Sequence, residues 1–431
     1  MSHLKNFTKI ALLIILIFSA AAKSAEVESS NEFFARSTFY GKSYLYTDSS
    51  QTLYSLTSEN KIIFNRFVEM KLTPEFIYLD QPRFHESNEN YFETKEAFLS
   101  FYSQKLTTRL GFFQMKKEGP DIFDPLDYQQ PKNYLDLLHP SKLPLQGVSF
   151  EYQINSYSSV EATYITKNKT PILPTINSPW YPRDNKIPTQ SESASLKVPD
   201  NVSYKIKTNE TDQGAADHNY ILKSKSQTDS FDFVLQIAET LSNTPTITPV
   251  LSGTLISVNP IYEVQLTNPI EIDVLWKKTK YYGFGITKPI DRLRLLTKIF
   301  FNQSISPDDR INSYNIAVEK QFENLTLIFE SSFQSSEARS AATNAASSSG
   351  LFSQAVALGL RYAPTDYFSF VLGGFNDFKK GSYYFMINPK ISLTSNLFAE
   401  IQVDQMGGKK DSLLWYFEHN DSISTKLSYL F

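Results

Sequence analysis

Cysteine is absent from this 431-residue sequence, and glycine is scarce, with 15 residues. Without cysteine no disulfide can form, so the stability of the fold must come from an extensive hydrogen-bonded scaffold. After the first 25 residues, no apolar run reaches the ~20 residues that a membrane-spanning helix needs. A chain of this kind can cross a membrane only as a closed β-barrel, in which every backbone polar group is paired.

Sequence motifs of catalysis and cofactor binding are also missing. The chain has no G-x-S-x-G, no H-E-x-x-H, no phosphate-binding P-loop and no glycine-rich dinucleotide signature, and its five histidines are isolated in sequence. The net charge of −3 gives no reason to expect nucleic acid as a partner. We therefore expect no catalytic residue, no metal and no cofactor. A hydrolase whose site is built from scattered barrel residues stays open as an alternative.

The first 25 residues have the pattern of a secretory signal peptide. Lys5 and Lys9 form a positively charged start, an apolar run of nine residues follows, and small residues up to Ala25 offer a cleavage site. The alternative, a membrane anchor, is disfavoured because the run is too short to span a bilayer. We expect residues 1–25 to be removed and residues 26–431 to form one mature domain.

Apolar and polar residues alternate along most of the remaining chain, which is the signal of half-buried β-strands. In NLFAEIQVDQ, for example, Leu397, Ala399, Ile401 and Val403 share one face, and the other face is mostly polar. Aromatic residues make up 14% of the sequence and fall on the apolar face of nearly every predicted strand. A β-sandwich would also alternate, but it would not need outward aromatics on so many strands.

The connections between these segments are of two kinds. Some are very short, such as Thr73-Pro74, whereas Glu118–Pro144, Asn168–Ala216, Leu241–Ile270 and Ser335–Gly350 are long and irregular. Short turns at one end and long loops at the other give about 18 strands (roughly 16 to 20), the layout of outer-membrane barrels with periplasmic turns and extracellular loops. The predicted fold is all-β: a single transmembrane, antiparallel, up-and-down β-barrel that starts near Phe33.

The last strand, DSISTKLSYLF, has an apolar face formed by Leu427, Tyr429 and Phe431. A barrel has no free edge, so this strand is expected to pair with the first one. Its alternating aromatic end resembles the signal by which the barrel assembly machinery recognises outer-membrane barrels. We expect that machinery, outer-membrane lipid and lipopolysaccharide as partners. The preceding segment, Met406 to Asp421, is predicted to be the last outer loop.

The segment from Gly111 to Leu138 begins on a predicted strand and continues into a loop rich in aspartate and proline. It resembles the early loop of porin-like, mostly uncharacterised outer-membrane barrel proteins of Gram-negative bacteria, often G-R-Q…W-G-x-x-D-x-x-N-P-x-D…P-x-x-x-x-D. The chain departs from that pattern at Glu118, in place of tryptophan, and at Asp124, in place of asparagine. The later SPWYPRDN around Trp180 also resembles that group. The resemblance implies a porin-like barrel and no particular substrate. The matching positions are Gly111, Gln114, Gly119, Asp121, Pro125, Asp127, Pro131 and Asp136.

Three acids of this loop, Asp121, Asp124 and Asp127, recur at a spacing of three residues. One hypothesis is that the loop folds into the barrel and narrows the pore. A second is a cation site, since hard cations prefer carboxylate oxygens, but the run lacks the ligand pattern and glycine of an EF-hand. The third is a structured surface loop stiffened by proline and side-chain-capped turns.

Charged residues on the polar faces of the strands are expected to line the lumen. Their signs are mixed, so strong ion selectivity is not predicted, and neighbouring pairs could simply neutralise each other across the wall. The predicted pore-lining residues are Arg109, Glu151, Glu161, Asp232, Arg294, Lys298, Glu319, Glu330, Arg361, Lys390, Glu400, Asp404 and Lys426.

These features together predict an outer-membrane channel for the passive diffusion of small hydrophilic solutes. An export channel for a polysaccharide would favour a lumen of one charge sign. A plugged barrel that acts through its long loops, above all Asn168–Ala216, is the alternative from another functional class.

Overall fold

The structure, a computed structural model, describes residues 26–41, 50–80, 89–127, 130–135, 139–174, 180, 194–199, 204–228, 230–242, 245–258, 261–290, 293–307, 309–338, 354–379, 381–409, 412, 414–417 and 420–431. The predicted signal peptide lies outside the described residues. In the described part of the chain, no helix is long and apolar enough to cross a membrane.

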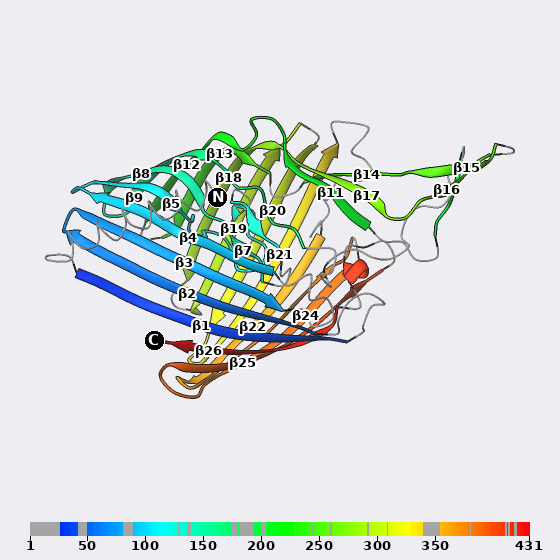
Figure 1. Ribbon diagram of the computed structural model, residues 1–431. Coiled ribbons are helices and arrows are strands. Elements are labelled where there is room, and N and C mark those ends of the chain that lie inside the picture. The colour runs from blue at the N-terminus through cyan, green and yellow to red at the C-terminus, as the bar shows by residue number, and fades with distance from the viewer. Residues whose placement is uncertain are drawn as a thin grey trace, which may run out of the picture.

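Eighteen strands form one closed antiparallel sheet, as the alternation predicted (Figure 1). Each strand pairs with the next wall strand in the chain, and the last, β26, pairs with the first, β1, which closes the barrel. The wall strands are β1 (Glu26–Tyr40), β2 (Ser50–Asn65), β3 (Val68–Asp80), β4 (Glu89–Tyr102), β5 (Leu106–Phe113), β8 (Leu145–Asn155), β9 (Ser158–Lys167), β12 (Asp217–Gln227), β13 (Asp232–Leu241), β18 (Lys278–Ile290), β19 (Leu295–Ile305), β20 (Asp309–Gln321), β21 (Leu325–Ala338), β22 (Gln354–Thr365), β23 (Phe368–Asp377), β24 (Ser382–Ser392), β25 (Leu397–Gly408) and β26 (Ser422–Leu430).

The two faces of each strand differ in the way the sequence predicted. On β21, Phe329 points outward and is 41% exposed, whereas the next residue, Glu330, points inward and is completely buried. Leu427, Tyr429 and Phe431 are likewise exposed on the outside of β26 and its end. Because closure pairs every strand on both sides, no hydrogen-bonding edge is left open.

Turns of two to four residues join the strands at one end of the barrel, and longer loops predominate at the other. β1 begins and β26 ends at the short-turn end, where the backbones of Asn31 and Phe431 exchange two hydrogen bonds of 3.0 Å. The loop before β26 contains a short 3-10 helix, η5 (Leu414–Phe417), as expected for a segment outside the wall.

Several local expectations were wrong. β21 continues to Ala338 and β25 to Gly408, so the loops after them do not begin at Ser335 and Met406, and the connection after β5 begins at residue 114, before Glu118.

Thr73-Pro74 is not a turn but lies inside β3, at a register shift against β4, since proline cannot donate a ladder hydrogen bond and is tolerated at such a bulge. The first strand begins at Glu26, well before Phe33. The long connection after Leu241 does not end at Ile270 but continues to Lys278, where β18 starts.

The two longest loops build an extension that the sequence did not predict. Its tip is the sheet β10 (Ala194–Lys197), β16 (Tyr262–Leu266) and β15 (Gly253–Ser257), and its base is the sheet β11 (Tyr204–Thr211), β17 (Ile270–Trp276) and β14 (Thr246–Val250). In Figure 1 the tip reaches away from the long-loop end of the barrel. At the base, Trp276 is buried and donates from Nε1 to Asn209 at 2.7 Å.

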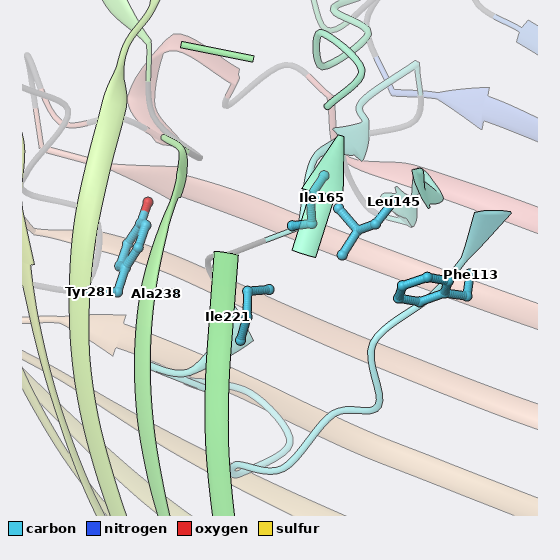
Figure 2. Packing of buried hydrophobic residues seen from close by; sticks show 6 residues of the cluster. All are labelled: Phe113, Leu145, Ile165, Ile221, Ala238 and Tyr281. Atoms are coloured by element: carbon cyan, nitrogen blue, oxygen red, sulfur yellow. The ribbon is translucent and has the colours of Figure 1, made fainter. Parts of the chain in front are cut away.

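The interior of the barrel is not uniformly polar. Near the long-loop end, inward-facing residues of six neighbouring strands form an apolar cluster, with Met115 packed against it (Figure 2). Its buried members are Phe113, Leu145, Ile165, Ile221, Ala238 and Tyr281. The cluster covers the point at which the chain leaves β5, so it supports the base of the loop described next.

Candidate functional site: the lumen and its inserted loop

The described parts of the loop between β5 and β8, residues 114–127, 130–135 and 139–144, lie inside the barrel and reach its far wall. The loop carries a small hairpin, β6 (Lys132–Asn133) and β7 (Ser141–Lys142), and makes contacts with β12, β13, β19, β21, β22 and β25. In the ring of strands, β22 stands diametrically opposite β5. The aspartate-rich segment of the sequence therefore folds into the lumen and does not lie on the surface.

The carboxylate of Glu330 on β21 holds the middle of this loop. It accepts hydrogen bonds from three consecutive backbone N–H groups, those of Asp121 (2.9 Å), Ile122 (3.1 Å to each oxygen) and Phe123 (2.8 Å). The Arg361 guanidinium of β22 pairs with the Asp121 carboxylate beside them. A buried carboxylate with several N–H donors is a strong, charge-assisted anchor.

Two apolar side chains fix the loop on either side of that anchor. Phe123 packs on Ala355 and Ala357 of β22, with its ring 6.0 Å from the ring of Phe375 on β23. Leu126 packs against Val234 and Phe300. It also lies over Gly283 of β18, where an added Cβ would come within 2.4 Å of the Leu126 side chain. Small wall residues thus provide the space that the loop occupies.

Asp124 shapes the loop from within. Its carboxylate accepts hydrogen bonds from the backbone N–H groups of Gly119 (3.0 Å) and Leu126 (2.9 Å). Burial raises the pKa of Asp124 to about 6, although these two N–H groups act in the opposite direction. Asparagine, which the resembling porin loops have here, would keep an acceptor without the charge.

Asp127 joins the loop to its own hairpin. It forms ion pairs with Lys132 (3.0 Å) on β6 and Lys142 (2.5 Å) on β7. Burial alone would raise the pKa of Asp127, but the two ammonium groups outweigh it and hold the pKa below the usual value. The three aspartates therefore have separate partners and do not converge on a cation. In the described part of the chain, no group of three or more potential ligands could hold a metal ion.

Further contacts tie the two ends of the loop to the wall. Glu118, which replaces the tryptophan of the resembling pattern, pairs with Lys223 (3.4 Å) and Lys225 on β12. At the other end, His139 is hydrogen-bonded to Gln402 of β25 at 3.0 Å. Asp136 and Pro182, which belong to the resembling segments, lie outside the described residues.

A second segment crosses the long-loop end above this loop. Lys169 pairs with Glu93 of β4 at 2.5 Å, and Ile172 forms a bridge to Asn133 of the β6–β7 hairpin. Trp180 is buried, with its ring 6.4 Å from the ring of Tyr40 on β1 and 5.8 Å from that of Phe417. Trp180, in the loop after β9, therefore lies at the rim beside β1 and the loop before β26.

Most of the predicted pore-lining charges lie on inward faces and have partners. Arg109 pairs with Glu151 (3.6 Å), Lys298 with Glu319, and Lys426 with Glu32 (3.9 Å). Several of the remaining acids accept hydrogen bonds from uncharged side chains, and the other remaining residues lie in register with an acid or near a strand end. Glu161 accepts from Ser149, Glu400 from Asn388 and Asp404 from Tyr384; Lys390 stands in register with Glu400, Asp232 begins β13, and Arg294 lies exposed in the turn before β19.

Sequence reasoning missed a network of charges on β2, β3 and β4. Lys71 bridges Glu59 (2.7 Å) and Glu96 (2.8 Å), and Lys95 pairs with the buried Glu75 (2.7 Å). Lys61 of β2 adds pairs with Glu28 (3.7 Å) and Glu69 (3.6 Å). The period-two spacing of Glu69, Lys71, Thr73 and Glu75 in VEMKLTPE was the signal available.

No family model matches the chain, and no curated protein matches it by sequence. Solved structures resemble it across nearly its whole length. OccK5 (OpdH) of Pseudomonas aeruginosa is 10% identical, with a TM-score of 0.52 over 95% of this chain and 98% of that one. OccAB1 of Acinetobacter baumannii is 8% identical, with a TM-score of 0.52 over 94% and 95%. Pseudomonas aeruginosa OccK2 (OpdF), crystallised in complex with glucuronate, is 9% identical, with a TM-score of 0.50 over 95% and 98%. The chain therefore has the fold of outer-membrane porins.

Proposed function

We propose that the protein is a channel in the outer membrane of a Gram-negative bacterium, through which small hydrophilic solutes diffuse passively. The observation that carries the proposal is the loop of residues 114–144, which crosses the lumen and is fixed to the far wall through Glu330. A wall that is apolar outside and charged inside supports the membrane location. The porin fold of the solved relatives agrees with this reading.

In this channel the loop forms the constriction, and the inward-facing charges form its lining. Asp121, Asp124 and Asp127 shape the constriction through their contacts and do not present a row of free carboxylates. The lining carries both signs, largely paired across neighbouring strands. Such a lumen would pass polar solutes and discriminate weakly between anions and cations.

Recording from single molecules in a planar bilayer tests the proposal. Discrete conductance steps are expected from folded, heat-modifiable protein. Folded protein without conductance would overturn the channel and favour the plugged barrel. Liposome swelling with sugars, amino acids and uronic acids would then define the solute class. Uronic acids belong in the series because OccK2 was crystallised with glucuronate.

A second candidate, a barrel that acts through its loops, is favoured by the extension. At its tip Leu255 is 54% exposed, Val258 62% and Tyr262 57%, which is unusual for a surface facing water. Deleting residues 246–266 would separate the two functions. A channel keeps its conductance after this deletion, whereas a surface-interaction protein loses its binding. The mixed charges of the lumen give no support to polysaccharide export.

The proposed assembly route follows from the ends of the chain. Residues 1–25 would direct export and be removed, and Leu427, Tyr429 and Phe431 would be recognised by the barrel assembly machinery. The outward exposure of these three side chains, between 47% and 57%, leaves them accessible on the finished wall.

A further inference from the structure

The outward face of strands β18 to β20 changes from apolar to polar toward the long-loop end of the barrel. Ile299 and Ile316 point outward near its middle and are 50% and 48% exposed. The next outward row toward the long loops, here named the aromatic row, consists of Phe284, Phe301 and Tyr314. The rings of Phe301 and Tyr314 lie 5.1 Å apart. Aromatic side chains in such a row mark the height at which the hydrocarbon of a bilayer meets its headgroups.

Beyond the aromatic row, most outward side chains of the same strands are polar or cationic. Gln303 of β19 donates from Nε2 to Oδ1 of Asn312 on β20 at 2.7 Å. The following row has Lys280 of β18 and Arg310 of β20 on either side of Ile305. Two steps of two residues, on strands tilted by about 40°, raise this row about 10 Å above the aromatic rings. The cations therefore lie at the level of the lipid headgroups.

Lys280 belongs to a small group of charges at this level. Its side chain is 57% exposed, and Lys278 is the next outward residue of β18 toward the long loops. Both ammonium groups approach one carboxylate, that of Glu239 on β13, at 3.7 and 3.6 Å. Arg310 adds a third cation, and Glu337 of β21 stands in register with it. The group thus has three cations and two acids, and exposed ion pairs as long as these are weak enough to open for another anion.

The basic patch, formed by Lys278, Lys280, Gln303, Arg310 and Asn312, has two cationic ends. One strand lies between Lys280 and Arg310, so their backbones are about 10 Å apart. The carboxamides of Gln303 and Asn312 form the row between these cations and the aromatic row. Cationic side chains bind phosphate, and carboxamides can both donate to and accept from sugar hydroxyls. The patch therefore matches two phosphates joined by a sugar backbone better than the single phosphate of a glycerophospholipid.

We propose that the basic patch binds the diphosphorylated disaccharide headgroup of lipopolysaccharide in the outer leaflet. Lys278 and Lys280 hold one phosphate, Arg310 holds the other, and the acyl chains lie along the aromatic row. The site rests on the proposed placement in the outer membrane, with the long loops outside the cell. A second copy of the chain is a poorer occupant, because a two-fold contact centred here would bring the cations of both copies together.

Native mass spectrometry of the detergent-purified, full-length barrel tests the site. Diphosphorylated lipid A, its monophosphorylated form and phosphatidylglycerol are titrated separately against each variant. The unmodified protein should bind the diphosphorylated form most tightly. The double variant Lys280→Gln/Arg310→Gln should bind that form about tenfold more weakly and no longer distinguish it from the monophosphorylated form. Its binding of phosphatidylglycerol should be unchanged.

A matched control uses the opposite ends of the same two strands. The double variant Lys288→Gln/Lys320→Gln removes two outward lysines at the short-turn ends of β18 and β20. It changes the net charge by the same amount and should bind diphosphorylated lipid A as the unmodified protein does. Both double variants should remain heat-modifiable barrels, because the substituted side chains point away from the lumen.

Three results would overturn the site. Equal binding of diphosphorylated lipid A by the two double variants would show that the patch is not involved. A loss of phosphatidylglycerol as large as that of lipid A in Lys280→Gln/Arg310→Gln would reduce the patch to a general anionic surface. A dimer that this variant dissociates, with no bound lipid, would assign the patch to a second copy.

Bilayer conductance of the same samples separates this inference from the proposed function. Specific binding of lipid A without conductance leaves the site standing and overturns the channel. Conductance without specific binding of lipid A leaves the channel standing and overturns the site.

Discussion

At the scale of single residues, Glu330 makes the connection between the wall and the middle of the inserted loop. Glu330 is completely buried on the wall, and its carboxylate accepts from three successive N–H groups of the loop. These donors belong to the backbone, so the loop sequence matters less here than the presence of the acid. The position on β21 could be predicted as inward-facing, but its partner was not, since period-two alternation assigns faces and not long-range contacts.

Glu330→Gln should loosen the constriction loop without unfolding the barrel. The neutral amide offers one acceptor oxygen, so the anchor is weakened by about 1–2 kcal/mol. The loop should then leave the wall about 5–30 times more often, which would appear as larger open-channel noise. Glu319→Gln is the control, because Glu319 is also an inward-facing acid but pairs with Lys298 of the wall. Identical noise in both variants would mean that the loop is held elsewhere.

The pH dependence of the loop should follow from Asp124 and Asp127. The pKa of Asp124 is raised from 3.8 to about 6, so its contribution to stability is fully present below about 4 and is lost as pH rises through 6. The effect is at most on the order of 3 kcal/mol. Asp127 acts in the opposite sense, because its lowered pKa gives stability that is lost only below about 4.

Hydrogen exchange of the loop amides, corrected for intrinsic rates, measures this balance. Protection of segment 119–126 should be greatest near pH 4–5 and decrease toward pH 7. Asp124→Asn should remove that decrease, whereas Asp121→Asn should retain it, because Asp121 pairs with Arg361 outside the buried turn. A flat profile in the unmodified protein would contradict the assigned role of burial.

At the scale of elements, the strands were predictable where one face is apolar throughout. The pattern of β26 located its faces, and the loop before it lies outside the wall as expected. The Thr73-Pro74 dipeptide was predicted to be a turn because proline is common in turns as well as at bulges. The pairing of β3 with β2 and β4 on both sides of the dipeptide shows that it is a bulge within a strand. The strands of the extension are short, and two of their pairings are parallel contacts between distant loops. The periodicity of apolar residues in the sequence does not indicate such contacts.

Phe431→Ser should reduce assembly of the barrel in the membrane more than it reduces the stability of the folded barrel. The residue after β26 is 57% exposed, so its loss removes little packing, while its backbone bonds to Asn31 remain. Pulse-labelling of heat-modifiable protein in cells measures assembly, and urea titration in detergent measures stability. Ser428→Ala, on the lumen face of the same strand, should leave assembly unchanged. Equal assembly by both variants would contradict a recognition role for the terminal aromatic.

At the scale of the whole molecule, composition and alternation were enough to predict a closed barrel and its strand number. A chain without spanning helices has only this way of crossing a bilayer, so a coarse pattern suffices. The interior required the structure. The loop between β5 and β8 reaches β21 and β22 on the far side of the ring, and the charges of β2 to β4 meet only because those strands are neighbours. Contacts across the lumen depend on how the strands close into a ring. Local patterns in a single sequence carry no signal for them.

The electrostatic balance of the lumen can be tested at one row of side chains. Lys390, Glu400, Lys426 and Arg36 stand side by side on β24, β25, β26 and β1, so Glu400 is the one acid among three cations. Glu400→Lys should make the row uniformly positive and shift the reversal potential in a salt gradient toward anions. Glu400→Gln should give a smaller shift of the same sign. Asp404, also predicted to line the pore, is buried and hydrogen-bonded to Tyr384, Gln402 and Ser422, so reversing its charge should impair folding instead. An unchanged reversal potential in Glu400→Lys would mean that ions pass elsewhere or not at all.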